Sequence, residues 1–278
     1  MDSSAGFRVL LSSPPLAYVC IPNHIQFKID CTYMNQRSTH MCNIIIFGQT
    51  GAGKSSLINL LARNNVAPTS SNLSGGTESN ESFKISRSAN KTYTFWDTPG
   101  LNEGEQGTVP ASQAIENLCN LINEIRSVNL IIYCIRGPRL PDIVRVNYDL
   151  FCGIVCEGKV PIVLVVTGLE QESDMDQWWA NYKKDIKKMH MTFEGHACVT
   201  STKGREDIYK REYMQSVDKV WALVQKHCPP DALTLTTGWT FEVPTRIEAY
   251  MREYNARTGK ERKHLPKTQH HGKGSLVG

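Results

Sequence analysis

The 278-residue sequence has no long hydrophobic run. Its longest apolar runs, residues 130–135 and 162–166, are five or six residues long, whereas a membrane-spanning helix needs about 20. The apolar residues 9–11 are followed by two serines and two prolines, which is unlike a signal peptide. The sequence therefore predicts a soluble protein without a transmembrane segment.

The nine cysteines lack the regular spacing of a secreted disulfide framework. Cys134 lies inside an apolar run and Cys42 just before one, where reduced cysteine packs as a small hydrophobic residue. Cys152 and Cys156 have a spacing that a metal site could use, but the mostly apolar helical stretch around them favours core packing. We therefore expect a reducing compartment and a cytoplasmic protein.

The body of the chain lacks an excess of either charge. The net charge is +4, but residues 255–278 contain six Lys or Arg against one acid and carry +5, so the remainder sums to −1. A basic footprint for nucleic acid is not indicated in the body. We expect residues 255–278 to form a basic, solvated and disordered tail.

The pattern of apolar and polar residues changes near residue 42. Residues 1–41 contain paired prolines and show no sustained period, which leaves open whether this N-terminal arm folds. Within residues 42–228, apolar runs of strand length alternate with longer amphipathic segments, the pattern of βαβ units and a parallel sheet. After two prolines, residues 229–254 form an extension with one candidate helix at 239–254.

The strand-length runs predict a mixed six-stranded sheet covered by helices. The connection between the second and third runs has four residues and requires an antiparallel hairpin, because a parallel crossover needs a dozen residues or more. The expected strands are 43–48, 83–87, 92–96, 130–135, 161–166 and 197–199. The expected helices start at Lys54, cover 115–125, 142–156 and 178–189, and end with 213–224.

A phosphate-binding loop follows the first of these strands. It fits the pattern G-x-x-x-x-G-K-[ST] and opens a helix, as that motif requires. The residues are Gly48, Gln49, Thr50, Gly51, Ala52, Gly53, Lys54 and Ser55.

Each residue type in this loop has a chemical reason. Glycines let the backbone wrap closely, so that N–H groups converge on a phosphate beside a helix N-terminus. Lys54 would reach the β- and γ-phosphates, Ser55 would bind Mg²⁺, and Ser56 would contact the α-phosphate. The alternative is a glycine-rich turn that only leads into a helix.

The sequence Asp97-Thr98-Pro99-Gly100 directly follows the third strand. An acid at that strand end can hold Mg²⁺ through a water, and a glycine lets a backbone N–H approach the γ-phosphate. A further metal ligand is expected between the first helix and the hairpin, where we favour Thr77 over Thr69. The catalytic set is therefore Lys54, Thr77 and Gly100, and the metal set is Ser55, Thr77 and Asp97. The alternative is that neither threonine binds metal.

Two further loops are candidates for reading the base. Thr167-Gly168-Leu169-Glu170 follows the fifth strand, and the carboxylate of Glu170 can accept the N1 and N2 hydrogens of guanine. A glycine stands at position 168, where GTPases usually carry a lysine whose stem covers the base. The alternative is a strand-end loop with a solvated glutamate.

The second base-reading candidate follows the sixth strand, and its residues are Thr200-Ser201-Thr202-Lys203-Gly204. We predict that Ser201, Thr202 and Lys203 bind the nucleotide, through a backbone N–H to guanine O6 and the lysine stem on the base. The alternative is an ordinary polar loop after a strand.

These motifs occur in the order found in GTPases and span about residues 42–227. The set resembles the septin-like branch of P-loop GTPases, which includes septins, Toc-type import receptors and the immunity-associated GIMAP GTPases. The segments 107–111, 147–151, 160–170 and 195–198 resemble uncharacterised fungal single-domain G proteins. The resemblance implies a Ras-like, three-layer α/β P-loop fold that binds GTP or GDP with Mg²⁺.

The hydrolytic rate is a separate question. After Gly100 the chain has Leu101, where Ras-like enzymes place a water-orienting glutamine; Asn102 is the next polar side chain. We expect slow Mg²⁺-dependent GTP hydrolysis that a partner or a homodimer across the nucleotide face accelerates. Arg136 and Arg139 are candidates to reach a neighbouring site, and the alternative is that both only solvate their loop.

Two alternatives to this reading remain. One is a GTP-binding assembly or scaffold module with little hydrolysis, which Leu101 favours. The other is an ATP-binding P-loop NTPase, against which Thr167 and Glu170 argue.

Overall fold

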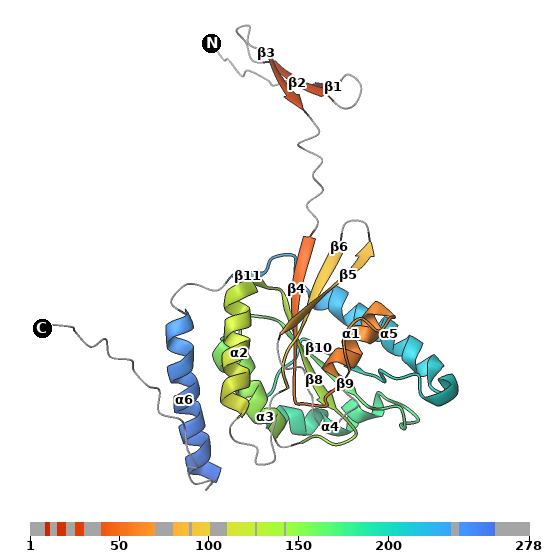
Figure 1. Ribbon diagram of the computed structural model, residues 1–278, viewed down its shortest axis with the longest axis vertical. Coiled ribbons are helices and arrows are strands. Elements are labelled where there is room, and N and C mark those ends of the chain that lie inside the picture. The colour runs from red at the N-terminus through yellow and green to blue at the C-terminus, as the bar shows by residue number, and fades with distance from the viewer. Residues whose placement is uncertain are drawn as a thin grey trace, which may run out of the picture.

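The computed structural model describes residues 9–11, 16–20, 26–30, 40–69, 80–88, 91–100, 110–125, 127–141, 143–234 and 239–258. Its centre is a six-stranded sheet in the order β10-β9-β8-β4-β6-β5 (Figure 1). Neighbouring strands are parallel except for the antiparallel pair β5–β6. The strands are β4 (His40–Phe47), β5 (Glu81–Ser88), β6 (Lys91–Asp97), β8 (Leu130–Arg136), β9 (Ile162–Thr167) and β10 (Gly195–Cys198).

Helices cover both faces of this sheet, and this arrangement confirms the expected α/β fold with one hairpin (Figure 1). The first and last residues of each expected strand differ from those of an observed strand by at most three positions. The helices are α1 (Lys54–Ala62), α2 (Pro110–Ile125), α3 (Ile143–Tyr148), α4 (Gln177–Lys188), α5 (Lys210–His227) and α6 (Trp239–Thr258).

Strand β4 contributes to two separate hydrophobic cores, because successive side chains of a strand point to opposite faces. Ile44 and Ile46 pack with residues of α1 and α5. Ile45 and Phe47 pack with residues of α2, α4 and the segment after α3. A parallel sheet that is covered on both faces reads as continuous apolar runs, which is why its strands were recognisable in the sequence.

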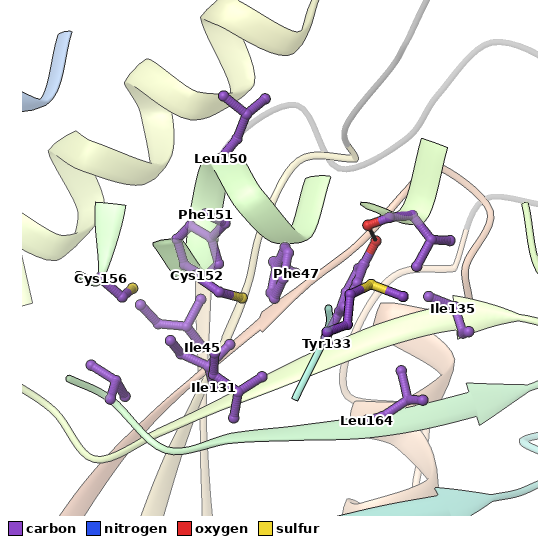
Figure 2. Close-up of a cluster of buried hydrophobic side chains, with 14 of the residues drawn as sticks. Ile45, Phe47, Ile131, Tyr133, Ile135, Leu150, Phe151, Cys152, Cys156 and Leu164 are labelled. Carbon is purple, nitrogen blue, oxygen red and sulfur yellow. Dashed lines mark hydrogen bonds between the residues drawn. The ribbon is translucent and has the colours of Figure 1, made fainter. Parts of the chain in front are cut away.

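Aromatic side chains fill the second core where β4 meets β8 (Figure 2). The rings of Phe47 and Tyr133 are stacked with centroids 4.3 Å apart, and Phe151 packs on Phe47 at the same distance. The Tyr133 hydroxyl donates a hydrogen bond of 2.9 Å to the carbonyl oxygen of Val144, so its polar end is satisfied inside the core.

The segment expected as one α-helix at 142–156 changes its winding. After α3 the chain continues as a π-helix, η2 (Asp149–Val155), and the N–H of Cys156 donates to the carbonyl of Phe151, five residues earlier. Leu150 and Val155 are both buried, as are Phe151 and Cys156. Because a π-helix places residues five apart on one face, the wider turn directs both pairs into the core.

The C-terminal extension forms α6, which packs against η2 and α2. Tyr250 donates a hydrogen bond of 2.9 Å to Asp149 Oδ2. Helix α6 runs to Thr258, four residues past the expected end at 254, and the ion pair of Glu253 with Arg257 supports its last turn.

Smaller elements complete the description. Within the N-terminal arm, β1 (Val9–Leu11), β2 (Leu16–Cys20) and β3 (Gln26–Asp30) form an antiparallel three-stranded sheet. A two-stranded ribbon joins β7 (Ser127–Val128) to β11 (Leu233–Thr234), and a short 3₁₀ turn, η3 (Arg205–Asp207), precedes α5. Among the helices of the described residues, none has the length and apolar character needed to cross a membrane.

Candidate functional site

The predicted functional loops gather at one edge of the sheet. Strands β4, β6, β8, β9 and β10 run parallel, so the loops that follow them start from their carboxyl ends at the same edge. In open α/β sheets, ligands bind in crevices outside this edge.

The loop between β4 and α1 wraps around a buried ammonium group. Lys54 is 7% exposed, and its Nζ donates to the carbonyl oxygens of Gly48 at 3.3 Å and Gln49 at 3.2 Å. A turn bond of 3.1 Å from the N–H of Ala52 to the carbonyl of Gln49 closes the loop. Gly51 has a φ of 73°, in the left-handed region that favours glycine.

Helix α1 begins directly after this loop and suits an anion. Its first residues are Lys54, Ser55 and half-buried Ser56. The N-cap is Gly53, which makes no side-chain capping bond, and the first turn carries no acidic residue. Backbone N–H groups and the positive end of the helix dipole together bind phosphates at such a terminus.

Two glycines allow contacts that a side chain would prevent. A Cβ on Gly48 would lie 2.1 Å from the carbonyl oxygen of Cys134 in β8. A Cβ on Gly100 would lie 2.1 Å from Thr50 Oγ1 and 2.6 Å from both the backbone nitrogen and the Cα of Thr50. The loop after β6 is therefore packed directly on the backbone of the phosphate-binding loop.

An oxygen pair lies between α1 and the end of β6. The hydroxyl of Ser55 donates to Asp97 Oδ2 at 2.5 Å, and Asp97 is 1% exposed. Thr98 donates a hydrogen bond of 2.9 Å to the carbonyl of Ile46, which fixes the chain after Asp97 on β4. Hydroxyl and carboxylate oxygens are the donors that Mg²⁺ prefers, so this pair fits that ion.

The thiol of Cys134 lies behind the phosphate-binding loop. It donates to the carbonyl of Ala52 at 3.0 Å, and burial raises its pKa to about 12, partly offset by the charge of Lys54. The group is therefore a neutral thiol at physiological pH and serves as a hydrogen-bond donor to the loop.

Thr167 connects the phosphate-binding loop to the first base-reading loop. Its side chain is 1% exposed, and its hydroxyl lies 2.7 Å from the carbonyl oxygen of Ala52 and 3.3 Å from that of Ile135. Thr167 also packs against Gly53, where a Cβ would lie 3.1 Å from Thr167 Oγ1. We predicted Thr167 in the nucleotide-binding set; in the structure its hydroxyl is engaged with the main chain behind the loop.

Glu170 is joined to the second base-reading loop through Thr200. The fully buried Thr200 hydroxyl lies 3.2 Å from Glu170 Oε2 and 3.2 Å from the carbonyl oxygen of Thr202, and it can donate to one of them at a time. The N–H of Thr200 donates to Ser216 Oγ at 3.1 Å, which anchors the loop on α5. The sequence set started at Ser201 and missed Thr200; the available signal was a threonine directly after a buried strand.

The remaining residues of that loop face solvent. Thr202 and Lys203 are exposed and Ser201 is half-buried. The Lys203 ammonium lies 5.3 Å from the ring centroid of Tyr213, so in this structure it contacts an aromatic ring of α5. Thr202 Oγ1 accepts the N–H of Gly204 at 3.0 Å, which shapes the turn.

Several predicted residues lie outside the described residues, and two others are exposed. Thr77, Leu101 and Asn102 lie outside the described residues. Thr69, the alternative to Thr77, is exposed. Arg139 is also exposed, in the loop after β8.

Curated relatives of the chain are bacterial GTPases named Der. The chain is 26% identical over 170 residues to the GTPase Der of Campylobacter jejuni subsp. jejuni serotype O:23/36, covering 61% of this chain and 34% of that protein. It is 29% identical over 152 residues to the GTPase Der of Campylobacter curvus, covering 54% and 30%. The chain thus spans about a third of the length of these curated relatives.

Solved structures share the fold at low identity. Era from Aquifex aeolicus, bound to GDP and aluminium fluoride, has a TM-score of 0.51 at 18% identity, covering 68% of this chain and 57% of that chain. Toc33 from Arabidopsis thaliana, in a dimerization-deficient variant, has a TM-score of 0.51 at 16% identity, covering 73% and 91%. Residues 43–188, more than half of the chain, match the family described as 50S ribosome-binding GTPase. The chain, whose predicted phosphate and base loops lie at one sheet edge, belongs to this GTPase family.

Proposed function

We propose that the chain binds GTP and GDP with Mg²⁺ at the carboxyl edge of its sheet and hydrolyses GTP slowly, as a molecular switch. The observation that carries the proposal is the 2.5 Å contact between Ser55 Oγ and Asp97 Oδ2, beside the buried ammonium of Lys54. A hydroxyl, a carboxylate and a lysine at the start of a helix are the groups that hold a magnesium-bound triphosphate in P-loop enzymes.

The residues around the predicted phosphate site, here called the phosphate end, would have separate roles. When bound, Mg²⁺ neutralises charge on the phosphate oxygens. Ser55 would be its direct ligand and Asp97 would hold it through water, with Thr77 as the proposed second hydroxyl ligand. Lys54 would orient the phosphates, and the N–H of Gly100 would sense the γ-phosphate because Gly100 is packed on Thr50.

The base end favours guanine over adenine. Guanine presents two hydrogen-bond donors, at N1 and N2, to a carboxylate, whereas adenine presents an acceptor at N1 and has no 2-amino group. The Thr200 hydroxyl beside Oε2 of Glu170 supports a fixed carboxylate there. ATP binding is the alternative, and a nucleotide competition decides between them.

Slow hydrolysis follows from Leu101, which cannot orient water as a glutamine does. We assign the chain to the septin-like branch on its T-x-x-E and D-T-P-G motifs. The Toc33 neighbour is described as a dimerization-deficient variant, which says that Toc33 itself dimerises. We extend this property to the chain and propose a homodimer across the nucleotide face, with the exposed Arg139 as a group that could reach the partner.

Leu101 also favours a second candidate function. A GTP-binding module that assembles with partners and hydrolyses little would need the same phosphate and base contacts but no water-orienting residue. The two candidate functions predict different rates of GTP turnover but the same affinity for guanine nucleotides.

A cytoplasmic location belongs to the proposal as well. The seven cysteines that the structure describes are free thiols, six of them buried. Burial raises the pKa of Cys198 to about 11, as it raises that of Cys134. Such protonated core thiols fit a reducing compartment.

The testing experiment measures affinity and turnover on the purified full chain. Titration calorimetry with GDP, GTP and ATP, with and without Mg²⁺, should give tighter binding of guanine nucleotides that depends on Mg²⁺. Turnover per protein should be slow at nanomolar concentration and rise toward high micromolar concentration. Equal affinity for ATP and GTP contradicts the base assignment, and absent turnover at every concentration favours the assembly module.

A further inference from the structure

The side chain of Arg136 lies against Gly168, where a side chain at position 168 would begin. Arg136 ends β8, and its register partner is Thr167, the last residue of β9. A Cβ on Gly168 would lie 3.2 Å from Arg136 Cγ, 3.4 Å from Nε and 3.6 Å from Cζ. Both the aliphatic stem and the guanidinium group of Arg136 therefore lie across Gly168.

The two loops are fixed to each other at this point. The N–H of Gly137 donates to the carbonyl of Thr167 at 2.8 Å. A Cβ on Gly137 would lie 2.5 Å from Cδ2 of Leu169, which is fully buried. Gly168 has a φ of 74°, which disfavours any residue with a side chain. Position 168 of the base-reading loop thus has no side chain of its own, and the side chain of Arg136 from the neighbouring strand β8 lies beside it.

The guanidinium of Arg136 is available for a ligand. Arg136 is exposed, and within the part of the chain that the structure describes its guanidinium forms no hydrogen bond or ion pair. Lys203, the cation of the second base-reading loop, has its ammonium over the ring of Tyr213. In the loop after β9, the buried Thr167 and Leu169 alternate with the half-buried Gly168 and Glu170. Arg136 thus lies against the residue two positions before Glu170.

We propose that Arg136 is a base-covering residue of its own nucleotide site, stacking its guanidinium plane on the face of the guanine whose edge Glu170 reads. The proposal rests on the guanine site proposed above. Arginine planes stack on nucleobases and are attracted to aromatic faces. Arg136 thereby acts within its own chain, which leaves Arg139 as the arginine that reaches a neighbouring protomer.

The test compares ligands that share phosphates but differ in the base. Dissociation constants for GDP, IDP and ribose 5′-diphosphate are measured by calorimetry with Mg²⁺ at low protein concentration. Arg136→Ala should weaken GDP and IDP by the same factor, about 3- to 30-fold, because stacking does not depend on the 2-amino group. Ribose 5′-diphosphate, which has no base to stack on, should bind as to the wild type.

Matched variants separate the alternatives. Arg211→Ala, an exposed arginine on α5, should change each constant less than twofold, and Glu170→Ala should weaken GDP more than IDP. Arg136→Lys keeps the stem and charge and should recover part of the affinity; it carries the test if circular dichroism shows that the alanine variant is misfolded. An Arg136→Ala protein that binds GDP within twofold of wild type, or loses ribose 5′-diphosphate by the same factor as GDP, overturns the proposal. A wild-type chain that binds no GDP would refute the proposed function itself.

Discussion

The two ends of the candidate site are built differently. At the phosphate end the main groups are buried: Lys54 is 7% exposed and Asp97 is 1% exposed. At the base end Arg136 and Lys203 are exposed, and Glu170 is held by one side-chain hydroxyl. The phosphate end is therefore part of the core, whereas the base end is assembled from loops on its surface. Substitutions at the phosphate end should abolish nucleotide binding, and substitutions at the base end should alter the affinity and the preference for guanine.

The largest effect is expected from Lys54→Ala. Because the ammonium is the charge that the phosphate loop encloses, GDP affinity should fall about 100-fold or more. Calorimetry measures the affinity, and circular dichroism checks that the domain stays folded. Lys226→Ala, an exposed lysine on α5, is the matched control. A folded Lys54→Ala protein with unchanged affinity would falsify the phosphate-loop assignment.

Glu170→Ala should have the next largest effect. Removing the carboxylate leaves two guanine donors unpaired at about 1–3 kcal/mol each, so the preference for GDP over ADP should fall tenfold or more. Binding of ribose 5′-diphosphate is the internal control, because it carries no base. If the preference for GDP persists, another group reads the guanine edge, and Glu170 is not the residue that defines the base end.

Thr200→Val tests whether the base end depends on its one buried hydroxyl. Valine fills the same volume but cannot donate to Glu170, so the GDP-to-ADP preference should fall about two- to tenfold. Thr92→Val, in the β5–β6 hairpin where its hydroxyl contacts Ser86, is the control and should leave the preference within twofold. An unchanged ratio in Thr200→Val would mean that Glu170 is positioned by its backbone alone.

The smallest effect is expected from deleting residues 259–278, which follow the last turn of α6. This segment follows the elements that form both ends of the site, so the dissociation constant for GDP should stay within twofold. Loss of GDP binding on this deletion, with α6 intact by circular dichroism, would show that the segment contributes to the domain.

The sequence predicted the fold because its signals were local. The apolar runs of β4, β8 and β9 are buried on both faces and read as strands, and the four-residue connection required the β5–β6 hairpin. The prediction that the chain belongs to the P-loop GTPases is confirmed by the family match over residues 43–188. The π-helix η2 was missed because an apolar stretch looks the same with a period of four or five.

The site was predictable where its residues follow one another in the chain. The phosphate-loop residues form one motif, whose assignment stays a prediction until it is tested. Thr200 was recognised only in three dimensions, since it acts through a contact 30 residues away. Arg136 was named from the sequence for a neighbouring site, and its position beside the loop after β9 follows from the register of β8 with β9. Thr77 and Leu101 stay sequence predictions.

The division of β4 between two cores has a thermodynamic consequence. Four successive residues, Ile44 to Phe47, are at most 1% exposed, two in each core, and the phosphate loop begins at the next residue. A ligand held by that loop is thus linked to the melting of both layers at once. By mass action, a nucleotide at 100 times its dissociation constant raises the free energy of unfolding by about 2.7 kcal/mol. The melting temperature of the whole domain should therefore rise with the fraction of protein that has nucleotide bound.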